Sequence, residues 1–102
     1  MILVRHEIGE VLRDFRQQKG RTLRQVASRA SVALGYLSEV ERGQKEASSE
    51  ILASVADALD VPISTIMREV SDRLSVLEGI TEFPDVVPDD LVASIEPELS
   101  LR

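Results

Sequence analysis

The stretch from Thr22 to Gly43 constrains the fold of this chain more than any other. It has the pattern of two short helices joined by a tight turn. Thr22 is followed three residues later by Gln25, a capping-box pattern that predicts the start of a helix. The first helix carries an apolar face at helical spacing, formed by Val26, Ala27 and Ala30.

The second helix of this stretch follows the segment Ser31-Val32-Ala33, which turns the chain. Leu37 and Val40 face inward, and Gly43 ends the helix. Ala27 is small enough for the two helices to cross closely. Two helices that cross steeply through a turn of a few residues form a helix-turn-helix unit, whose second helix fits the DNA major groove. We therefore predict helices over 23–30 and 34–42.

The same stretch resembles the XRE/Cro-CI helix-turn-helix family of bacterial regulators. The resemblance lies in T-L-R-Q-V-A, Val32 and G-Y-L-S-E-V-E-R-G, all in one register. The longer string L-G-Y-L-S-E-V-E-R-G-Q-K-E and the leading L-V-R-x-x-I-G-x-V-L-R are similar to the actinobacterial Clp-gene regulators. The resemblance covers about residues 5 to 70. It implies an all-α fold: a five-helix, lambda-repressor-like DNA-binding domain with a C-terminal helical extension.

The distribution of charge fits DNA binding better than the total does. The 102 residues carry a net charge of −6. Residues 1–68 have ten Lys or Arg and nine Asp or Glu, a net of +1, whereas residues 69–102 have two and nine, a net of −7. Local charge decides contact with phosphates. Six basic residues lie between positions 13 and 29 with one acid among them, and the motif beside them favours phosphate contact over a solvated basic face.

The residue types argue against most other classes of protein. There is no cysteine and only one histidine, His6, which we interpret as a surface residue. Neither a metal cluster nor a nucleophile–base pair can be assembled, so we expect no cofactor, no metal and no enzymatic activity. No apolar run approaches a membrane span, and the N-terminus is too short for a signal peptide. We expect a cytoplasmic protein.

Three further helices complete the predicted domain. Residues 1–6 are expected to be extended, and the first helix should run from Glu7 to Gln18. Another helix should follow Ser48–Ser49, with a serine N-cap and Glu50 in its first turn. Pro62 should open the last helix, which continues to about Glu78. We predict a DNA-binding domain over 1–68 and an acidic extension for dimerisation over 69–102.

The resemblance also gives two expectations about single residues. It implies an inward ion pair between Arg16 and Glu41, although Arg16 could contact a phosphate instead. The family usually has glycine in the turn at the place of Ser31, so a left-handed backbone conformation is in doubt here.

The last helix and the tail are predicted to form a dimer interface. Ile63, Ile66 and Met67 can finish the core, but the apolar residues beyond them need a partner. The acidic tail is either disordered or a second dimer element, and its aliphatic residues favour the second alternative. The predicted interface comprises Val70, Leu74, Leu77, Leu91, Val92 and Ile95.

The resemblance implies DNA-binding positions along the helix-turn-helix. Those that face bases are Leu34, Gly35, Tyr36, Ser38 and Glu39, and those near phosphates are Thr22, Leu23, Arg42 and Lys45. Ala33 and Arg24 are also predicted to belong to the DNA-binding site. Gln44 and Arg21 are further candidates for phosphate contact. Glu39 could accept from a cytosine amine, and Leu34 could touch a thymine methyl. Leu34 and Tyr36 could instead pack within the domain.

The predicted function is a transcriptional regulator that binds a palindromic operator in double-stranded DNA as a homodimer. The resemblance implies an activator of Clp protease genes that is itself degraded by the Clp system, through a signal at Leu99–Arg102. One alternative is an antitoxin whose acidic tail binds a protein partner. Another is a protein-binding helical domain that has lost DNA binding.

Overall fold

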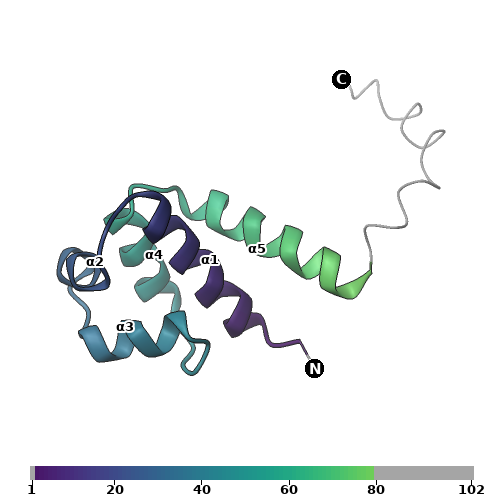
Figure 1. Cartoon of the computed structure of the whole chain (residues 1–102), viewed down its shortest axis with the longest axis horizontal. Helices are drawn as coiled ribbons and strands as arrows, with labels where there is room; N and C mark the ends of the chain where they lie inside the picture. The colour runs from purple at the N-terminus through teal and green to yellow at the C-terminus, as the bar shows by residue number, and fades with distance from the viewer. Residues whose placement is uncertain (1, 80–102) are drawn as a thin grey trace, which may run out of the picture.

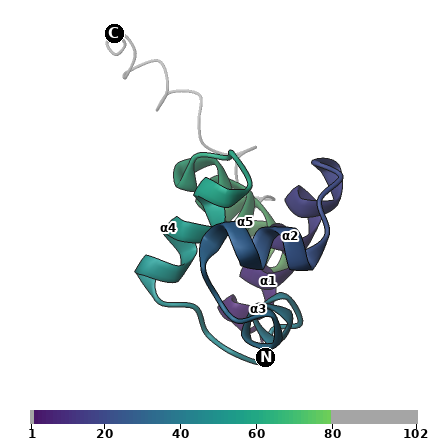
Figure 2. The ribbon, with the colours of Figure 1, turned by 90° about the vertical axis from the view of Figure 1, so that its left-hand side faces the viewer.

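The structure is a computed structural model that describes residues 2–79 (Figure 1). Over this range the chain is all-helical, as predicted, with no strand. Its five helices are α1 (Val4–Gln18), α2 (Leu23–Ala30), α3 (Leu34–Glu41), α4 (Ser49–Ala58) and α5 (Ile63–Glu78). Helices α2 and α3 lie at one end of the molecule, and α5 leads away toward the other end. Figure 2 views the first end, with α2 in front and α5 behind it.

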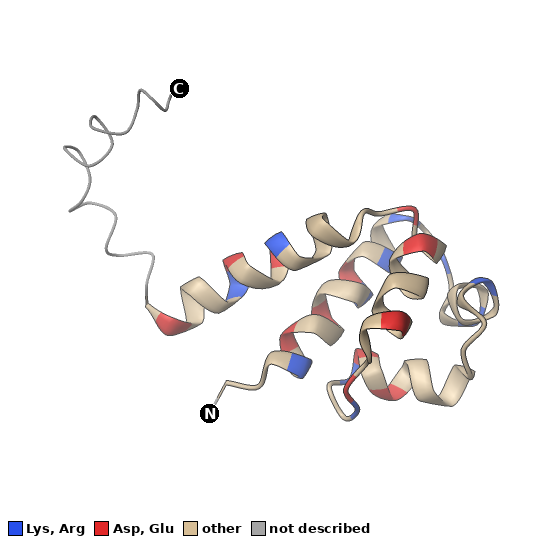
Figure 3. Ribbon diagram, turned by 180° about the vertical axis from the view of Figure 1, so that it is seen from behind, with Lys and Arg blue, Asp and Glu red and all other residues tan. Residues whose placement is uncertain are grey.

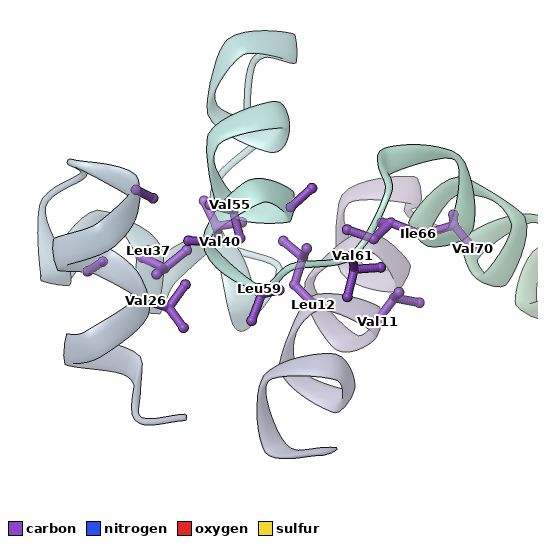
Figure 4. Packing of buried hydrophobic residues seen from close by; sticks show 14 residues of the cluster. Val11, Leu12, Val26, Leu37, Val40, Val55, Leu59, Val61, Ile66 and Val70 are labelled. Carbon is purple, nitrogen blue, oxygen red and sulfur yellow. The ribbon is translucent and has the colours of Figure 1, made fainter. Parts of the chain in front are cut away.

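One hydrophobic core joins all five helices. Figure 4 shows that side chains from each helix and from the α4–α5 connection form a continuous band between the helices, from α2 and α3 to α5. Leu12, Leu37, Leu59 and Ile66 are almost completely buried there. Burial of one such side chain stabilises the fold by roughly 1.5–3 kcal/mol. The core therefore fixes α2 and α3 relative to the rest of the domain.

Helix α1 begins at Val4, before the predicted start at Glu7, so the prediction of extended backbone is wrong for residues 4–6, whereas Leu3 is extended as predicted. Leu3 is the N-cap, and its carbonyl accepts from the N–H groups of His6 (3.0 Å) and Glu7 (3.3 Å). The reason is tertiary, because Arg5 Nε donates to the carbonyl of Gly43 at 3.0 Å. This contact holds the first turn of α1 against the end of α3.

A glycine allows α1 and α3 to cross very closely. Gly9 is buried, and a Cβ there would lie 2.3 Å from the carbonyl oxygen of Val40 and 2.6 Å from that of Glu41. No side chain fits at such distances. Sequence reasoning missed this contact, because Gly9 lies inside a helical pattern with no sign of what crosses it.

The helix-turn-helix itself has the predicted caps. Gln25 N–H donates to Thr22 Oγ1 (3.0 Å) and Thr22 N–H to Gln25 Oε1 (2.9 Å), which confirms the capping box. The doubt about Ser31 is resolved against the expectation, since its φ of 59° is left-handed. The N–H of Val32 bonds the carbonyl of Ala27 at 3.0 Å. That backward bond at a helix end requires a left-handed residue just before it.

The other helix boundaries agree closely with prediction. Ser48 caps α4 by accepting from the N–H of Ile51 at 3.2 Å, and α5 follows Pro62. Helix α3 ends at Glu41, one residue early, and Gly43 follows with φ +77°.

Helix α5 requires the largest correction. Val70, predicted to need a partner, is 5% exposed in the core of its own chain, and Leu74 packs against that core. Conversely, Ile63 and Met67 lie on the surface although they were expected inside. The reason is that α1 packs along α5 and selects a different face of it.

An arginine holds the second half of α5 on α1. Arg73 donates to Glu10 Oε1 at 3.2 Å and to Asp14 Oδ2. Leu77 is 52% exposed at the end of the helix. The predicted domain boundary at 68/69 falls inside α5, and the predicted interface residues Leu91, Val92 and Ile95 lie outside the described residues.

Candidate DNA-binding site

Helix α3 presents one face to the core and leaves the opposite face free. Leu37 and Val40, three residues apart, are 0% and 1% exposed. Gly35, Glu39 and Arg42 lie on other sides of the helix and are partly or fully exposed. A short helix anchored on one side in this way can enter a groove with its other side.

Two of the predicted base-facing residues also pack within the domain. Leu34 and Tyr36 are half-buried against the core. The Tyr36 hydroxyl donates to the carbonyl of Glu46 at 2.8 Å, which ties α3 to the connection before α4. The structure therefore supports the packing alternative for part of each side chain. Ala33, the N-cap of α3, is exposed, and Ser38 is partly buried.

Gly35 is an exposed position on α3 that carries no side chain. An ideal Cβ there would meet no heavy atom within 4 Å. Nothing in the described part of the chain therefore requires glycine at this place. The absence of a side chain leaves the helix backbone accessible to a ligand that approaches from outside.

The start of α2 is suited to an anion. Thr22 and Arg24 are exposed, and Leu23 is partly so. The first N–H groups of a helix have no intrahelical partner, and the helix dipole is positive at this end. Such a terminus accepts a phosphate group readily.

Arg16 and Glu41 lie together beneath this surface. Arg16 Nε donates to Glu41 Oε2 at 2.7 Å and Nη2 to Oε1 at 3.1 Å. The remaining nitrogen, Nη1, donates to the carbonyl of Arg21 at 3.0 Å. The side chains are only 16% and 8% exposed, and the hydrogen bond to Glu41 raises the pKa of Arg16. Every nitrogen of Arg16 is thus engaged within the protein, which favours the structural role over phosphate contact.

The basic residues fall into two groups. Arg21 is held by Asp60 at 2.7 Å and by the carbonyl of Ala58, so it is committed to the end of α4 rather than to a phosphate. Its hydrogen bond lowers the pKa of Asp60. Among residues 2–79, the cations with no acid within 4 Å are Arg13, Lys19, Arg24, Arg42, Lys45 and Arg68. Arg42 and Lys45 belong to the predicted phosphate contacts, and Arg24 to the predicted DNA-binding site.

Figure 3 shows how charge is arranged over the fold. Basic residues mark α2 and the connection before it, whereas α4 carries acids. The described residues contain no group of three potential metal ligands. His6 lies near the surface with Nε2 at 3.2 Å from Glu10. None of the helices described is long and apolar enough to cross a membrane.

These features define a helix-turn-helix DNA-binding domain: a capped helix, a tight turn, a second helix with a free face, and uncommitted cations beside it. Residues 7–66 match the family described as "Helix-turn-helix domain", and the chain belongs to this family. It is a helix-turn-helix transcriptional regulator, as predicted, and not an enzyme.

Its relatives are transcriptional regulators. The chain is 49% identical over 78 residues to the transcriptional regulator ClgR of Mycobacterium tuberculosis, covering 76% of this chain and 70% of that protein. It is 38% identical over 89 residues to the regulator SinR of Bacillus subtilis, covering 86% and 80%. The crystal structure of the clp gene regulator ClgR from Corynebacterium glutamicum superposes with a TM-score of 0.72 at 40% identity, covering 98% of this chain and 96% of that one.

The fold is shared more widely than the sequence. The restriction-modification controller C.Esp1396I has a TM-score of 0.67 at 18% identity, covering 72% of this chain and 95% of that one. That controller has been crystallised as a tetramer with its natural 35-base-pair operator. The resemblance and the fold class inferred from sequence are confirmed.

Proposed function

We propose that this regulator controls Clp protease genes, binding a palindromic operator as a homodimer with α3 in the major groove. The observation that carries the proposal is the exposed face of α3, which lies near cations that have no acidic partner among the described residues. The chain is also 49% identical to ClgR. Because its target is DNA, we place the protein in the cytoplasm.

Base readout would depend on few side chains. Glu39 is partly exposed on α3 and can accept a hydrogen bond from the amine of a cytosine. Leu34 offers its remaining exposed surface to a thymine methyl, and Gly35 lets the helix backbone approach the bases. Sequence-dependent DNA shape would supply the rest of the specificity.

Phosphates on either side of the groove would position the domain. The N-terminus of α2 offers the N–H groups near Leu23 and the side chains of Thr22 and Arg24 to one strand. Arg42 and Lys45 follow α3 and are exposed without an acidic partner among the described residues. Contacts of this kind fix the register and orientation on the duplex.

Dimerisation would use the free end of α5. Leu77 and Val76 are 52% and 66% exposed, and Ile2, Leu3 and Val4 are also exposed near the start of α1. Val70 is buried in its own chain and does not belong to this surface, and Leu74 contributes only the part of its side chain that remains exposed. Two copies on a palindrome would set their recognition helices roughly 34 Å apart.

Binding of the full chain to clp promoter fragments tests this function. Affinity is measured at about 50 and about 200 mM salt, where neutralisation of several phosphates predicts a steep decline. Glu39→Ala should alter the base preference at one symmetric position of the operator. Equal affinity for clp and scrambled fragments at both salt concentrations would overturn the proposal.

We also propose that the regulator is a substrate of the Clp system. The proposal rests on the resemblance alone, and the segment concerned lies outside the described residues. Deleting residues 97–102 should lengthen the cellular half-life, and an unchanged half-life would refute this part.

A further inference from the structure

A polar cleft of about 410 Å³ lies between α1 and α3, beside the proposed DNA surface. Helix α1 contributes Arg13 to its wall, and α3 and its C-cap contribute Ser38 and Arg42. The space far exceeds the roughly 30 Å³ of one water molecule. The helix-turn-helix motif did not single out this place, although Arg13 is one of the six basic residues between positions 13 and 29.

The acids of the cleft are already neutralised. Glu41 is bonded twice by Arg16, at 2.7 and 3.1 Å, and Glu10 is held by Arg73 at 3.2 Å. Arg13 has no acid within 4 Å among residues 2–79. Arg42 has none either, and it makes only a long bond of 3.4 Å to Gln44. Two guanidinium groups therefore line the cleft with their charge uncompensated.

Arg16, which lines the cleft, also connects it to the residue just before α2, where a phosphate contact is proposed. Arg16 donates both to Glu41, at the end of α3, and to the carbonyl of Arg21, just before α2. Arg13 lies one helical turn before Arg16 and therefore on the same side of α1. A DNA strand that touches the start of α2 and then Arg42 would pass the mouth of the cleft.

We propose that Arg13 and Arg42 together clamp one phosphate of the DNA backbone in this cleft. Guanidinium groups suit phosphate oxygens because they donate paired, charge-assisted hydrogen bonds. The Ser38 hydroxyl lies in the same wall as a further donor. The inference rests on the proposed function and adds a contact from α1 that positions the recognition helix without reading bases.

The test compares Arg13→Gln, Arg42→Gln and the double variant in the full chain. Arg68→Gln is the matched control, because Arg68 is an exposed arginine of α5 that has no acid within 4 Å among residues 2–79 and does not line the cleft. Binding to an operator fragment and to a scrambled fragment is measured across a salt series. Each cleft variant should lose affinity for both fragments by the same factor, and the salt slope should decrease by about 0.9. Because both arginines hold one phosphate, the double variant should lose less than the product of the single losses.

The outcomes separate the clamp from the function. If the wild type prefers the operator but Arg13→Gln behaves like Arg68→Gln, the clamp is refuted and the function stands. If the wild type shows no preference but the cleft variants still weaken binding to both fragments, the proposed operator recognition falls and the phosphate clamp stands. A titration with inorganic phosphate at constant ionic strength, followed by NMR without DNA, tests whether the cleft binds a free anion instead. Chemical-shift changes at both arginines, together with unchanged DNA affinity of the variants, would assign the cleft to a small anion and refute the clamp. Thermal melts verify that the variants fold.

Discussion

Replacing Arg16 by methionine would test the ion pair that joins α1 to the end of α3. The change removes three donor nitrogens and leaves the Glu41 carboxylate, 8% exposed, without its partner. Removing one member of a buried pair costs about 3–5 kcal/mol, and the 16% exposure of Arg16 places the loss near 3 kcal/mol. For a domain of this size, such a loss should lower Tm by roughly 12 °C or more.

The expected loss of stability comes from leaving the Glu41 carboxylate buried without a partner, rather than from losing its attraction to Arg16. The double variant Arg16→Met with Glu41→Leu should therefore recover much of the stability, since apolar replacement of a whole buried pair is often neutral. Urea and thermal unfolding of the single and double variants measure both effects.

An exposed ion pair provides the matched control. Glu46 is 79% exposed and lies 3.7 Å from Arg5, so Glu46→Gln should change stability by less than about 1 kcal/mol. A loss for Arg16→Met no larger than that of this control would refute the reasoning. The same conclusion would follow if the double variant were less stable than either single one.

Four other substitutions test separate features. Gly9→Ala should destabilise the fold by about 3 kcal/mol in urea unfolding, because its Cβ would lie 2.3 Å from the main chain of α3. Ser31→Gly should stabilise it by about 0.5–1 kcal/mol, measured in the same way, since glycine adopts a φ of 59° without strain. Gly35→Ala should raise helix stability by roughly 1 kcal/mol, as its Cβ has open space, while weakening operator binding in a titration. Asp60→Asn should abolish the part of the pH dependence of the unfolding free energy that comes from Asp60. The hydrogen bond from Arg21 lowers the pKa of folded Asp60, so its contribution is present at neutral pH and is lost as pH falls through that lowered pKa. Unfolding curves of wild type and variant should therefore differ near neutrality and converge in acid. Wild-type-like stability for Gly9→Ala, lower stability for Ser31→Gly, unchanged binding for Gly35→Ala, or a constant difference for Asp60→Asn would contradict the respective argument.

The sequence by itself determined the local elements of this protein. Side-chain caps and left-handed stops act within a few residues, so Thr22 with Gln25, Ser48 and Gly43 marked helix ends before any packing was known. The apolar periodicity of α2 and α3 was strong enough to identify the helix-turn-helix. The family resemblance came from the same local string.

Only the tertiary structure decided which faces are covered. Helix α1 gains its first turn from the contact between Arg5 and Gly43, and its packing along α5 buries Val70 but leaves Met67 outside. Likewise, Arg21 was a candidate phosphate contact by sequence, but in the structure it donates a hydrogen bond to Asp60. These outcomes depend on residues distant in sequence that meet in space. Periodicity shows that a helix has an apolar side, but the direction of that side depends on which neighbour packs against it.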